Sequence, residues 1–529
     1  MVNRCVNCGG LLHYDIGEAK LKCESCDSLF EVDSYGEKTE AKENQDAENM
    51  DMNIYTCPNC GAKISSTDGE AVEYCLYCGS FVTLSSSLEQ VKRPDYIMPF
   101  SKTIEDCKTK YKHMIGRKIY APKEFRDEEF LNGFKGIYIP YWTYDYDYGP
   151  RVSFKSKREY RKGDYIHTEE YNVSCRTDGS IKGVCFDASS SLDDSISSRI
   201  VPFDTDKLKD FNSAYMFGFF GDTADTESSV YLEDADEIAH DEIWKEVVGQ
   251  AQISDGVPQK PEEESFDENF GIKKTSHLAM LPLWFLTWRK NDRVAYSVMN
   301  GESGEMYSEV PVDIKRYLVI SLITAIPIFL LLNMFITFSA GKMLTLSVVL
   351  SFFMLILYTS ELDKIVKRTI HAEDKGYLAR HREAAYAAEQ YSENIFSKVG
   401  EILKDIFTGG IWMIFIVLGV GYMLIDILPI AAIVVGIASP IYLLFRIGRN
   451  GKLLGDGTVW LDIIGVLAAL LIAGGTLILD PAKDIYYYVT ALVCMGAVGF
   501  TAICAMRRYN ELVTRPVPHF FDREAGGEQ

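Results

Sequence analysis

Apolar stretches in the C-terminal part of the chain limit its fold more than any other feature. Residues 317–506 contain about six of them, each close to the length that crosses a lipid bilayer as a helix. Residues 1–312 are charged and contain no long apolar run. The sequence therefore predicts a polar N-terminal part joined to an all-α, polytopic membrane domain.

The membrane part divides into two groups of spans around a polar loop. The candidate spans are 317–338, 343–358, 411–428, 430–447, 459–479 and 485–506. We expect two transmembrane helices in 317–358, a cytoplasmic helical loop over 359–410, about four transmembrane helices in 411–506 and a cytoplasmic tail over 507–529. Because the third and fourth spans share the tight turn IDILP, they are either full spans or a re-entrant hairpin.

Basic residues lie mainly on one side of these spans. The stretches after the second, fourth and sixth spans carry fifteen Lys and Arg residues when Arg446, at the end of the fourth span, is included, whereas the opposite connections carry only Lys342 and Lys483. The positive-inside rule therefore places both termini in the cytoplasm, in a multi-pass protein of the plasma membrane. The first residues, MVNRCVNC, contain no apolar segment of a secretory signal, which agrees with this orientation.

Eight of the thirteen cysteines belong to a unit that occurs twice near the N-terminus. Each unit reads CxxC, fourteen intervening residues and a second CxxC, and the second unit follows the first at an offset of fifty-two residues. Two such knuckles place four sulfurs tetrahedrally, which suits a structural Zn²⁺ ion. We predict two zinc ions, one in a ribbon over 1–33 and one in a ribbon over 54–84. The predicted ligands are Cys5, Cys8, Cys23 and Cys26, and Cys57, Cys60, Cys75 and Cys78.

The residues that follow the knuckles fit this interpretation. Three knuckles continue with glycine (Gly9, Gly61 and Gly79), which allows a turn with positive φ, and the fourth continues with Asp27. A structural role is favoured over redox catalysis because no βαβ pattern surrounds any CxxC pair.

The charge of this region argues against binding of nucleic acid by the ribbons. Residues 1–95 carry eight Lys and Arg against seventeen Asp and Glu, a net charge of −9. Each zinc ion with four thiolates adds a further −2, which gives about −13. Contacts to phosphate need cations. Residues 34–53, between the ribbons, are acidic and are predicted to form a flexible linker.

Residues 94–312 show the mixed pattern of a cytoplasmic α+β domain. A strand is expected where Trp142, Tyr144, Tyr146 and Tyr148 alternate with polar residues, and packing against a core is favoured over a binding platform for this aromatic row. A helix is expected around 226–250, with Ile238, Trp244 and Val248 among its buried residues. Residues 204–270 have a net charge of −15. This charge indicates either a solvated acidic face, which is favoured, or a docking surface for a basic partner.

We find no catalytic or cofactor-binding constellation in the sequence, and we expect the protein not to be an enzyme. The chain contains no P-loop, GxSxG or HExxH motif, and its histidines, such as His113, His167, His240 and His277, are isolated. Within the predicted spans, Asp426 and Asp462 lie near the ends rather than at mid-bilayer, where a coupled transporter usually needs an ionisable group.

The order of these parts resembles that of a known family. Tandem CxxC ribbons, the motif YIMPF…FKGIYIPYWTYD and the motif LPLWFLTW…NGESGEMYSEVP before the first span are similar to those of bacterial, membrane-anchored TFIIB-type zinc-ribbon proteins (YdjG-like). Members are often labelled after the primosomal helicase because of the ribbon, but this chain has no helicase motif. The resemblance implies a scaffolding role beside SPFH/flotillin-like or phage-shock-like envelope proteins.

The predicted fold class is thus multi-domain, with two small zinc ribbons, an α+β cytoplasmic domain and an all-α membrane domain. The leading hypothesis is a non-enzymatic membrane scaffold that recruits a protein partner, in envelope stress or in membrane-microdomain organisation. The alternatives are a transporter or channel subunit with a zinc-ribbon regulatory domain and a nucleic-acid-binding membrane protein, which a basic face would favour. The oligomeric state is left open. The candidate contact residues on the ribbons are Leu11, Tyr14, Leu76 and Tyr77. The alternative is that these residues only pack the two ribbons together.

Overall fold

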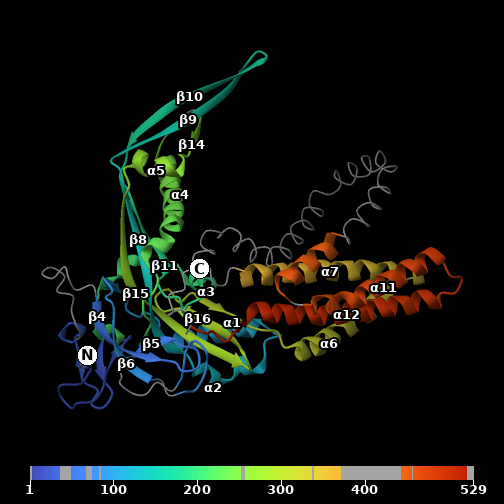
Figure 1. The fold of residues 1–529 in the computed structure, drawn as a ribbon, viewed down its shortest axis with the longest axis horizontal. Helices are drawn as coiled ribbons and strands as arrows, with labels where there is room; N and C mark the ends of the chain where they lie inside the picture. Colours follow the sequence, from blue (N-terminus) through green and yellow to red (C-terminus); the bar gives the residue numbers. More distant parts are fainter. Residues whose placement is uncertain are drawn as a thin grey trace.

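An α+β body lies at one end of a group of long helices (Figure 1). The computed structural model describes residues 3–35, 49–66, 74–82, 85–251, 256–335, 339–370, 442–455 and 457–520. The span predicted at 411–428 lies outside these residues, as do most of the span at 430–447, most of the loop at 359–410 and the end of the tail.

The chain alternates short strands with a few helices before its membrane part. The longer strands of the body are β4 (Asn49–Thr56), β6 (Ser85–Lys92), β8 (Lys135–Tyr148), β9 (Arg151–Lys162), β10 (Tyr165–Arg176), β11 (Gly179–Asp187), β15 (Lys273–Lys290) and β16 (Arg293–Asn300). The shorter strands are β1 (Leu12–Asp15), β2 (Lys20–Cys23), β3 (Leu29–Phe30), β5 (Lys63–Ser66), β7 (Tyr96–Ile97), β12 (Lys209–Asp210), β13 (Phe220–Gly221), β14 (Val257–Gln259), β17 (Met306–Ser308) and β18 (Arg515–Pro516). The helices are α1 (Ile104–Arg117), α2 (Glu128–Leu131), α3 (Asp194–Ile200), α4 (Leu232–Gln250), α5 (Glu263–Phe270), α6 (Ile314–Phe335), α7 (Ala340–Ile370), α11 (Val459–Leu479) and α12 (Ile485–Val513).

One large sheet forms the centre of the body. Its strand order is β12-β7-β15-β8-β13-β5-β4-β6, with β11 beside β8, and β16 beside β15, β17 and β18. Strands β8 and β15 pair antiparallel from Lys135 opposite Phe285 to Asp147 opposite Lys273. These two strands are apolar on both faces over much of their length because side chains pack on both sides of them.

The aromatic row of β8 belongs to the core, as the sequence favoured. Trp142, Tyr144, Tyr146 and Tyr148 are buried and share one apolar cluster with α4. The predicted helix is present as α4, but its buried face is shifted from the prediction. Ile243 and Val247 are fully buried, whereas the expected Val248 is half-buried.

The second ribbon is not a separate unit at the end of a flexible linker. We expected the flexible linker to run to residue 53, but β4 begins at Asn49 and pairs with β6 from Asn49 opposite Lys92 onwards. Strand β5 joins the same sheet through β13, with Ser65 opposite Gly221. The predicted linker ends earlier because alternating apolar residues, Met50 and Met52, are buried in this strand.

The structure contains apolar helices that mark a membrane protein. Among the described residues, three helices are long and apolar enough to cross a bilayer, namely Ala340–Arg368 within α7, α11 and α12. Helix α6 is also apolar and exposes Leu318, Val319 and Leu322. Helix α7 is longer than the second predicted span and continues to Ile370, into the region expected to form a helical loop.

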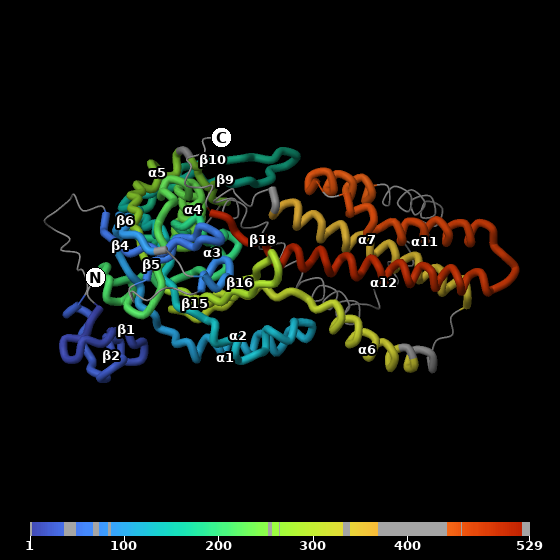
Figure 2. The backbone as a smooth tube through the Cα atoms, turned by 60° about the horizontal axis from the view of Figure 1, so that its bottom comes forward, coloured from blue at the N-terminus to red at the C-terminus, as the bar shows by residue number. Residues whose placement is uncertain are grey.

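The body is tied to the ends of the membrane helices. After α12 the chain returns to the body, where β18 pairs with β16 (Figure 2). Before α6, the backbone N–H of Val312 donates to Oδ1 of Asn510, 2.7 Å away, and Asn510 Nδ2 donates back to the Val312 carbonyl. The segments that flank the membrane part therefore lie at the same end of its helices.

A buried ionic group completes this junction. Arg515 pairs with Asp193, with 2.6 Å between Nη1 and Oδ2, and also with Glu309, which lies 3.5 Å from Arg368 of α7. Burial alone would raise the pKa of Asp193, but the positive charges of Arg515 and Arg368 and hydrogen bonds from Ser195 lower it to about 2. Buried charges of this kind persist only when paired, so the junction holds body and helices in one arrangement.

Candidate metal centres

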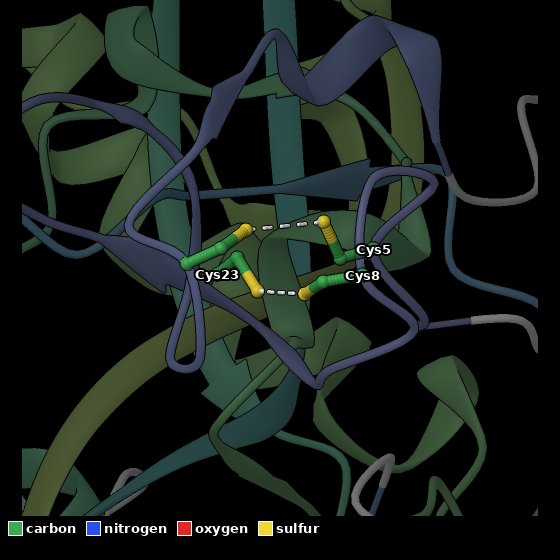
Figure 3. Close-up of side chains that lie close together, drawn as sticks. Cys5, Cys8 and Cys23 are labelled. Carbon is green, nitrogen blue, oxygen red and sulfur yellow. Dashed lines mark hydrogen bonds between the residues drawn. The ribbon is translucent and has the colours of Figure 1, made fainter.

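The eight predicted ligands meet in two groups of four. Within each group, all four sulfurs lie within 4.8 Å of one another. Figure 3 shows Cys5, Cys8 and Cys23 of the first group pointing toward a common centre. The closest sulfur pairs are Cys5–Cys26 at 3.7 Å and Cys8–Cys23 at 3.4 Å, and Cys57–Cys78 at 3.8 Å and Cys60–Cys75 at 3.6 Å.

These distances fit a structural zinc ion. With Zn–S bonds of about 2.3 Å, the edge of a tetrahedron of sulfurs is about 3.8 Å. The two closest sulfur pairs of each group match this edge to within a few tenths of an ångström, and four sulfurs would fill the coordination shell. Each group could therefore hold one zinc ion, which would supply folding energy rather than a reactive position.

The backbone turns repeat in all four knuckles. The residue after each CxxC pair has positive φ, with values of 77° at Gly9, 55° at Asp27, 79° at Gly61 and 65° at Gly79. In each turn, the backbone N–H of this residue donates to the carbonyl of the first cysteine of the knuckle, over 2.8–3.0 Å. The expectation from the glycines is confirmed, and Asp27 adopts the same turn because aspartate tolerates the left-handed region better than most residues.

Hydrogen-bond donors lie near several of the sulfurs. The backbone N–H groups of Asn7 and Gly10 donate to the sulfurs of Cys5 and Cys8, each over 3.4 Å. The hydroxyl and the backbone N–H of Ser28 lower the pKa of the Cys26 thiol to about 6. Ser80 lies at the repeat position, with its hydroxyl 3.3 Å from the sulfur of Cys78. Such contacts around a thiolate support metal binding.

The two groups differ in their surroundings. In the first, Cys8 and Cys26 are exposed, whereas all four cysteines of the second are buried. The first ribbon forms its own sheet of β1, β2 and β3, and contacts the body mainly through Tyr14. The backbone N–H of Tyr14 donates to the Phe217 carbonyl over 2.9 Å, and its ring meets that of Tyr215 at 5.3 Å.

The second group is enclosed because its last knuckle is apolar. Leu76 and Tyr77 stand between Cys75 and Cys78, at the positions of Glu24 and Ser25 in the first unit. The hydroxyl of Thr287 donates to the Leu76 carbonyl, and that of Tyr296 donates to the Tyr77 carbonyl. The knuckle thus packs directly on strands β15 and β16.

The side chain of Tyr77 also reaches a buried carboxylate. Its hydroxyl donates to Oδ2 of Asp222, which also accepts a hydrogen bond from Ser189. Burial raises the pKa of Asp222 to about 6, although the hydrogen bonds from Ser189 and Tyr77 act in the opposite direction. This contact connects the second metal group with the start of the segment after β13.

The predicted contact residues are mostly inside the protein. Tyr14, Leu76 and Tyr77 are buried and Leu11 is half-buried, and the first three pack the ribbons against the body rather than against each other. Two exposed apolar side chains on the knuckles were missed. Val6 lies within the first knuckle and is 76% exposed, and Phe81 follows the last knuckle and is 82% exposed. Their position beside the cysteines was the sequence signal that could have identified them as exposed contacts.

The four histidines named above lie apart from both groups. His240 contacts the carboxylates of Glu263 and Asp267, and His167 stacks on Tyr160 at 5.4 Å. His113 lies near Arg117 and His277 meets the ring of Tyr96. Among the described residues, the two cysteine groups are the sets of side chains that could hold a metal ion.

Comparison with known proteins gives one distant relative. No protein-family model matches the chain, and no solved structure matches it. The chain is similar to the uncharacterised protein YdjG of Bacillus subtilis (strain 168), with 23% identity over 327 residues, which cover 59% of this chain and 90% of YdjG. At the level of sequence, the chain is thus a distant homologue of a protein whose own role is not described.

Proposed function

We propose that the chain is a non-enzymatic, multi-pass anchor of the plasma membrane, whose zinc-stiffened cytoplasmic body recruits a protein partner. The observation that carries this proposal is the exposure of Val6 in the first knuckle and of Phe81 just after the last one. Exposed apolar side chains on a rigid support lose little conformational entropy on binding, which favours protein recognition.

The junction with the membrane supports the same proposal. Arg515, Glu309 and Asp193 join the end of α12 to the body. A partner bound to the ribbons would therefore be held at a defined place relative to the bilayer. The resemblance to membrane-anchored zinc-ribbon proteins of the TFIIB type suggests SPFH/flotillin-like or phage-shock-like proteins as partners, in envelope stress or in microdomain organisation.

The test is recovery of a partner with the full-length chain in mild detergent. We expect a protein that co-purifies with the unmodified chain to be lost from a variant with Val6→Asp and Phe81→Asp. The matched control is Val230→Asp, which adds a charge at an exposed valine away from the ribbons. Zinc content should be unchanged in both variants. Equal recovery from the two variants would refute the proposed contact surface.

A transporter or channel subunit with a regulatory zinc-ribbon domain is the second candidate. It is favoured by a polar contact among three membrane helices, where Asp462 of α11 accepts hydrogen bonds from Tyr358 of α7 at 2.6 Å and from Arg508 of α12 at 3.0 Å. Ionisable residues between membrane helices often serve transport. Ion flux through vesicles containing the purified chain, abolished by Asp462→Asn, would favour this candidate over the anchor.

A further inference from the structure

A long β-hairpin projects from the body. Strands β9 and β10 pair along their whole length, from Arg151 opposite Arg176 to Lys162 opposite Tyr165. Twelve residues of strand extend over about 40 Å. Near the body β9 is buried at Val152 and Phe154, but residues 158–170 are exposed on both strands. An exposed pair of strands is marginally stable by itself, so a hairpin of this length indicates a surface that supports it.

The tip of the hairpin combines cations with exposed apolar and aromatic side chains. Tyr165 and Ile166 are 76% and 74% exposed. The register places Lys162 opposite Tyr165 and Arg161 opposite Ile166. Each face of the tip therefore presents one cation beside one apolar or aromatic side chain.

The charges are distributed unevenly along the hairpin. Farther from the tip, the register places Glu169 opposite Arg158 and Glu170 opposite Lys157, so acids face these cations across the ladder. Near the tip, Glu159 lies two residues before Arg161 and Asp164 lies two residues after Lys162, so residues 155–164 carry five Lys and Arg against two acids. This basic end belongs to a chain whose net charge is −21. It is therefore a local feature that the overall composition conceals.

The hairpin points toward the membrane side of the molecule. Figures 1 and 2 are related by a rotation about the horizontal axis, along which the membrane helices run. In Figure 1 the hairpin rises away from the body and slants toward the side of the helices, and in both views its tip reaches about as far along this axis as the ends of α7 and α12 nearest the body. These helix ends extend beyond the apolar stretches that cross the bilayer, so the tip lies on the side of the bilayer that faces the body.

A second basic segment lies at the same level. Helix α1 ends at Arg117, the connection after it begins with Lys118 and the exposed Ile119, and this connection is fixed to the start of α6. The Arg316 guanidinium donates to the Ala121 carbonyl over 3.0 Å, and the rings of Tyr120 and Tyr317 lie 4.9 Å apart. Cations and apolar side chains thus occur at two separate places on the side of the body that faces the helices.

We propose that the tip of the β9–β10 hairpin, residues 160–167, docks on the anionic headgroup surface of the membrane that the protein's own helices cross. Arg161 and Lys162 bind lipid phosphates, and Tyr165 and Ile166 enter the interface between headgroups and acyl chains. Clustered basic residues bind anionic lipid surfaces, and tyrosine is enriched at membrane interfaces. The inference rests on the proposed membrane anchor and gives the body a second attachment to the bilayer.

The test is photo-crosslinking from the tip in the full-length chain. The chain is reconstituted in phosphatidylcholine vesicles with and without phosphatidylglycerol, with benzoylphenylalanine in place of Tyr165. The control places the same residue at Tyr171, farther from the tip on the same strand. We expect lipid adducts at position 165, fewer at position 171, and a strong dependence on phosphatidylglycerol.

Charge variants define the role of the cations. Arg161→Gln with Lys162→Gln should reduce the adduct yield by about ten-fold or more. Lys155→Gln with Lys157→Gln removes the same charge nearer the body and should leave the yield unchanged. Both pairs lie on the exposed hairpin, so zinc content and thermal unfolding should match those of the unmodified chain.

The outcomes separate this inference from the proposed function. Equal adducts at 165 and 171, or adducts that do not depend on phosphatidylglycerol, would overturn the docking of the tip on lipid. Crosslinks from position 165 in cells to RNA, DNA or protein in place of lipid would also overturn it, and would assign the hairpin to that class of partner. Loss of a co-purifying partner from the Val6 and Phe81 variant tests the anchor independently, because those residues lie outside the hairpin.

Discussion

The two zinc ribbons share one sequence pattern but occupy different environments. Both have four cysteines at the same spacing, four sulfurs within 4.8 Å and the same backbone turns. The first remains a small sheet at the surface, whereas the second contributes β4 and β5 to the main sheet. The difference shows that the cysteines determine the metal centre, and that the residues between them determine where the ribbon packs.

The last knuckle of each unit makes this difference visible. The first unit reads CESC and the second reads CLYC. Glu24 and Ser25 are exposed, while Leu76 and Tyr77 are buried against β15 and β16. Burial of one leucine and one tyrosine stabilises the packed arrangement by several kcal/mol, about 1.5–3 kcal/mol for each large side chain. Leu76 and Tyr77 thus help to hold the second ribbon in the core, together with the strands that it contributes to the main sheet.

The largest expected difference concerns loss of a metal ligand. Cys75→Ser should unfold the whole body, because a structural zinc ion contributes about 10–16 kcal/mol and a typical domain has only about 5–15 kcal/mol in total. Cys23→Ser should unfold only the first ribbon, since that ribbon has its own sheet. Hydrogen exchange of the full chain in detergent measures both. Exchange that spreads through β8 and β15 in Cys23→Ser would contradict the comparison.

The two centres should release their metal ions at different rates. We expect two zinc ions per chain by elemental analysis, and a chelator should remove them in two phases of about equal amplitude. The fast phase belongs to the first centre, because Cys8 and Cys26 are exposed and this ribbon opens without unfolding the core. Cys23→Ser should abolish the fast phase and keep the slow one. A single phase in the unmodified chain would show that the surroundings do not matter.

Substitution of Tyr77 tests the packed knuckle by itself. Tyr77→Phe should lower the free energy of unfolding by about 1–3 kcal/mol, because Asp222 loses a buried hydrogen-bond donor. Ser25→Ala, at the repeat position in the exposed knuckle, should change it by less than about 0.5 kcal/mol. Thermal or denaturant unfolding of the metal-saturated chain gives both values.

The cost of Tyr77→Phe should also depend on pH. The pKa of Asp222 in the folded protein is raised to about 6, above its ordinary value of 3.8. The stability that this group contributes is therefore present below about pH 4 and is lost as pH rises through 6, where the buried carboxylate ionises. Since the ionised form needs the tyrosine donor most, the cost should be larger at pH 8 than at pH 6. An equal cost at both values would contradict the assignment of this hydrogen bond.

The smallest expected effects concern the turns after the knuckles. Asp27→Gly should stabilise the first ribbon by less than about 1 kcal/mol, because glycine adopts positive φ without strain. Gly79→Ala should destabilise the body by more than that, since an added Cβ would lie 3.2 Å from Cβ of Arg289 in a left-handed turn. Hydrogen exchange measures the stability of each region and shows whether each substitution stabilises or destabilises it.

The sequence predicted the metal groups well because their signal is local. All eight ligands and all four turns follow from spacing and from the residue after each knuckle. The packing of the second ribbon could not be predicted in this way, because it depends on the pairing of Ser65 with Gly221, which is distant in sequence. Leu76 and Tyr77 between the cysteines were the available signal, and we interpreted them as surface contacts.

The hairpin and the helix lengths show two other limits of sequence patterns. The outer part of β9 and β10 is polar or exposed on both faces, so the alternation that identifies a half-buried strand is missing. The length of α7 could not be predicted from its apolar stretch, because the helix continues beyond that stretch with charged residues such as Lys364 and Arg368. Hydropathy marks the part of a helix inside the bilayer, but not the part that continues into water.

The pairing of β18 with β16 has a consequence for the synthesis of the protein. Val294 pairs with Arg515, which leaves the ribosome roughly 220 residues later, after every membrane helix. At about 5–20 residues per second, one edge of the main sheet stays open for tens of seconds while the helices enter the bilayer. A chain cut short before residue 515 would keep this edge uncovered and lack the arginine that neutralises Glu309 and Asp193. Completion of the body thus reports that translation has reached the end of the last membrane helix, and an unfinished chain would present an open strand edge to chaperones and proteases.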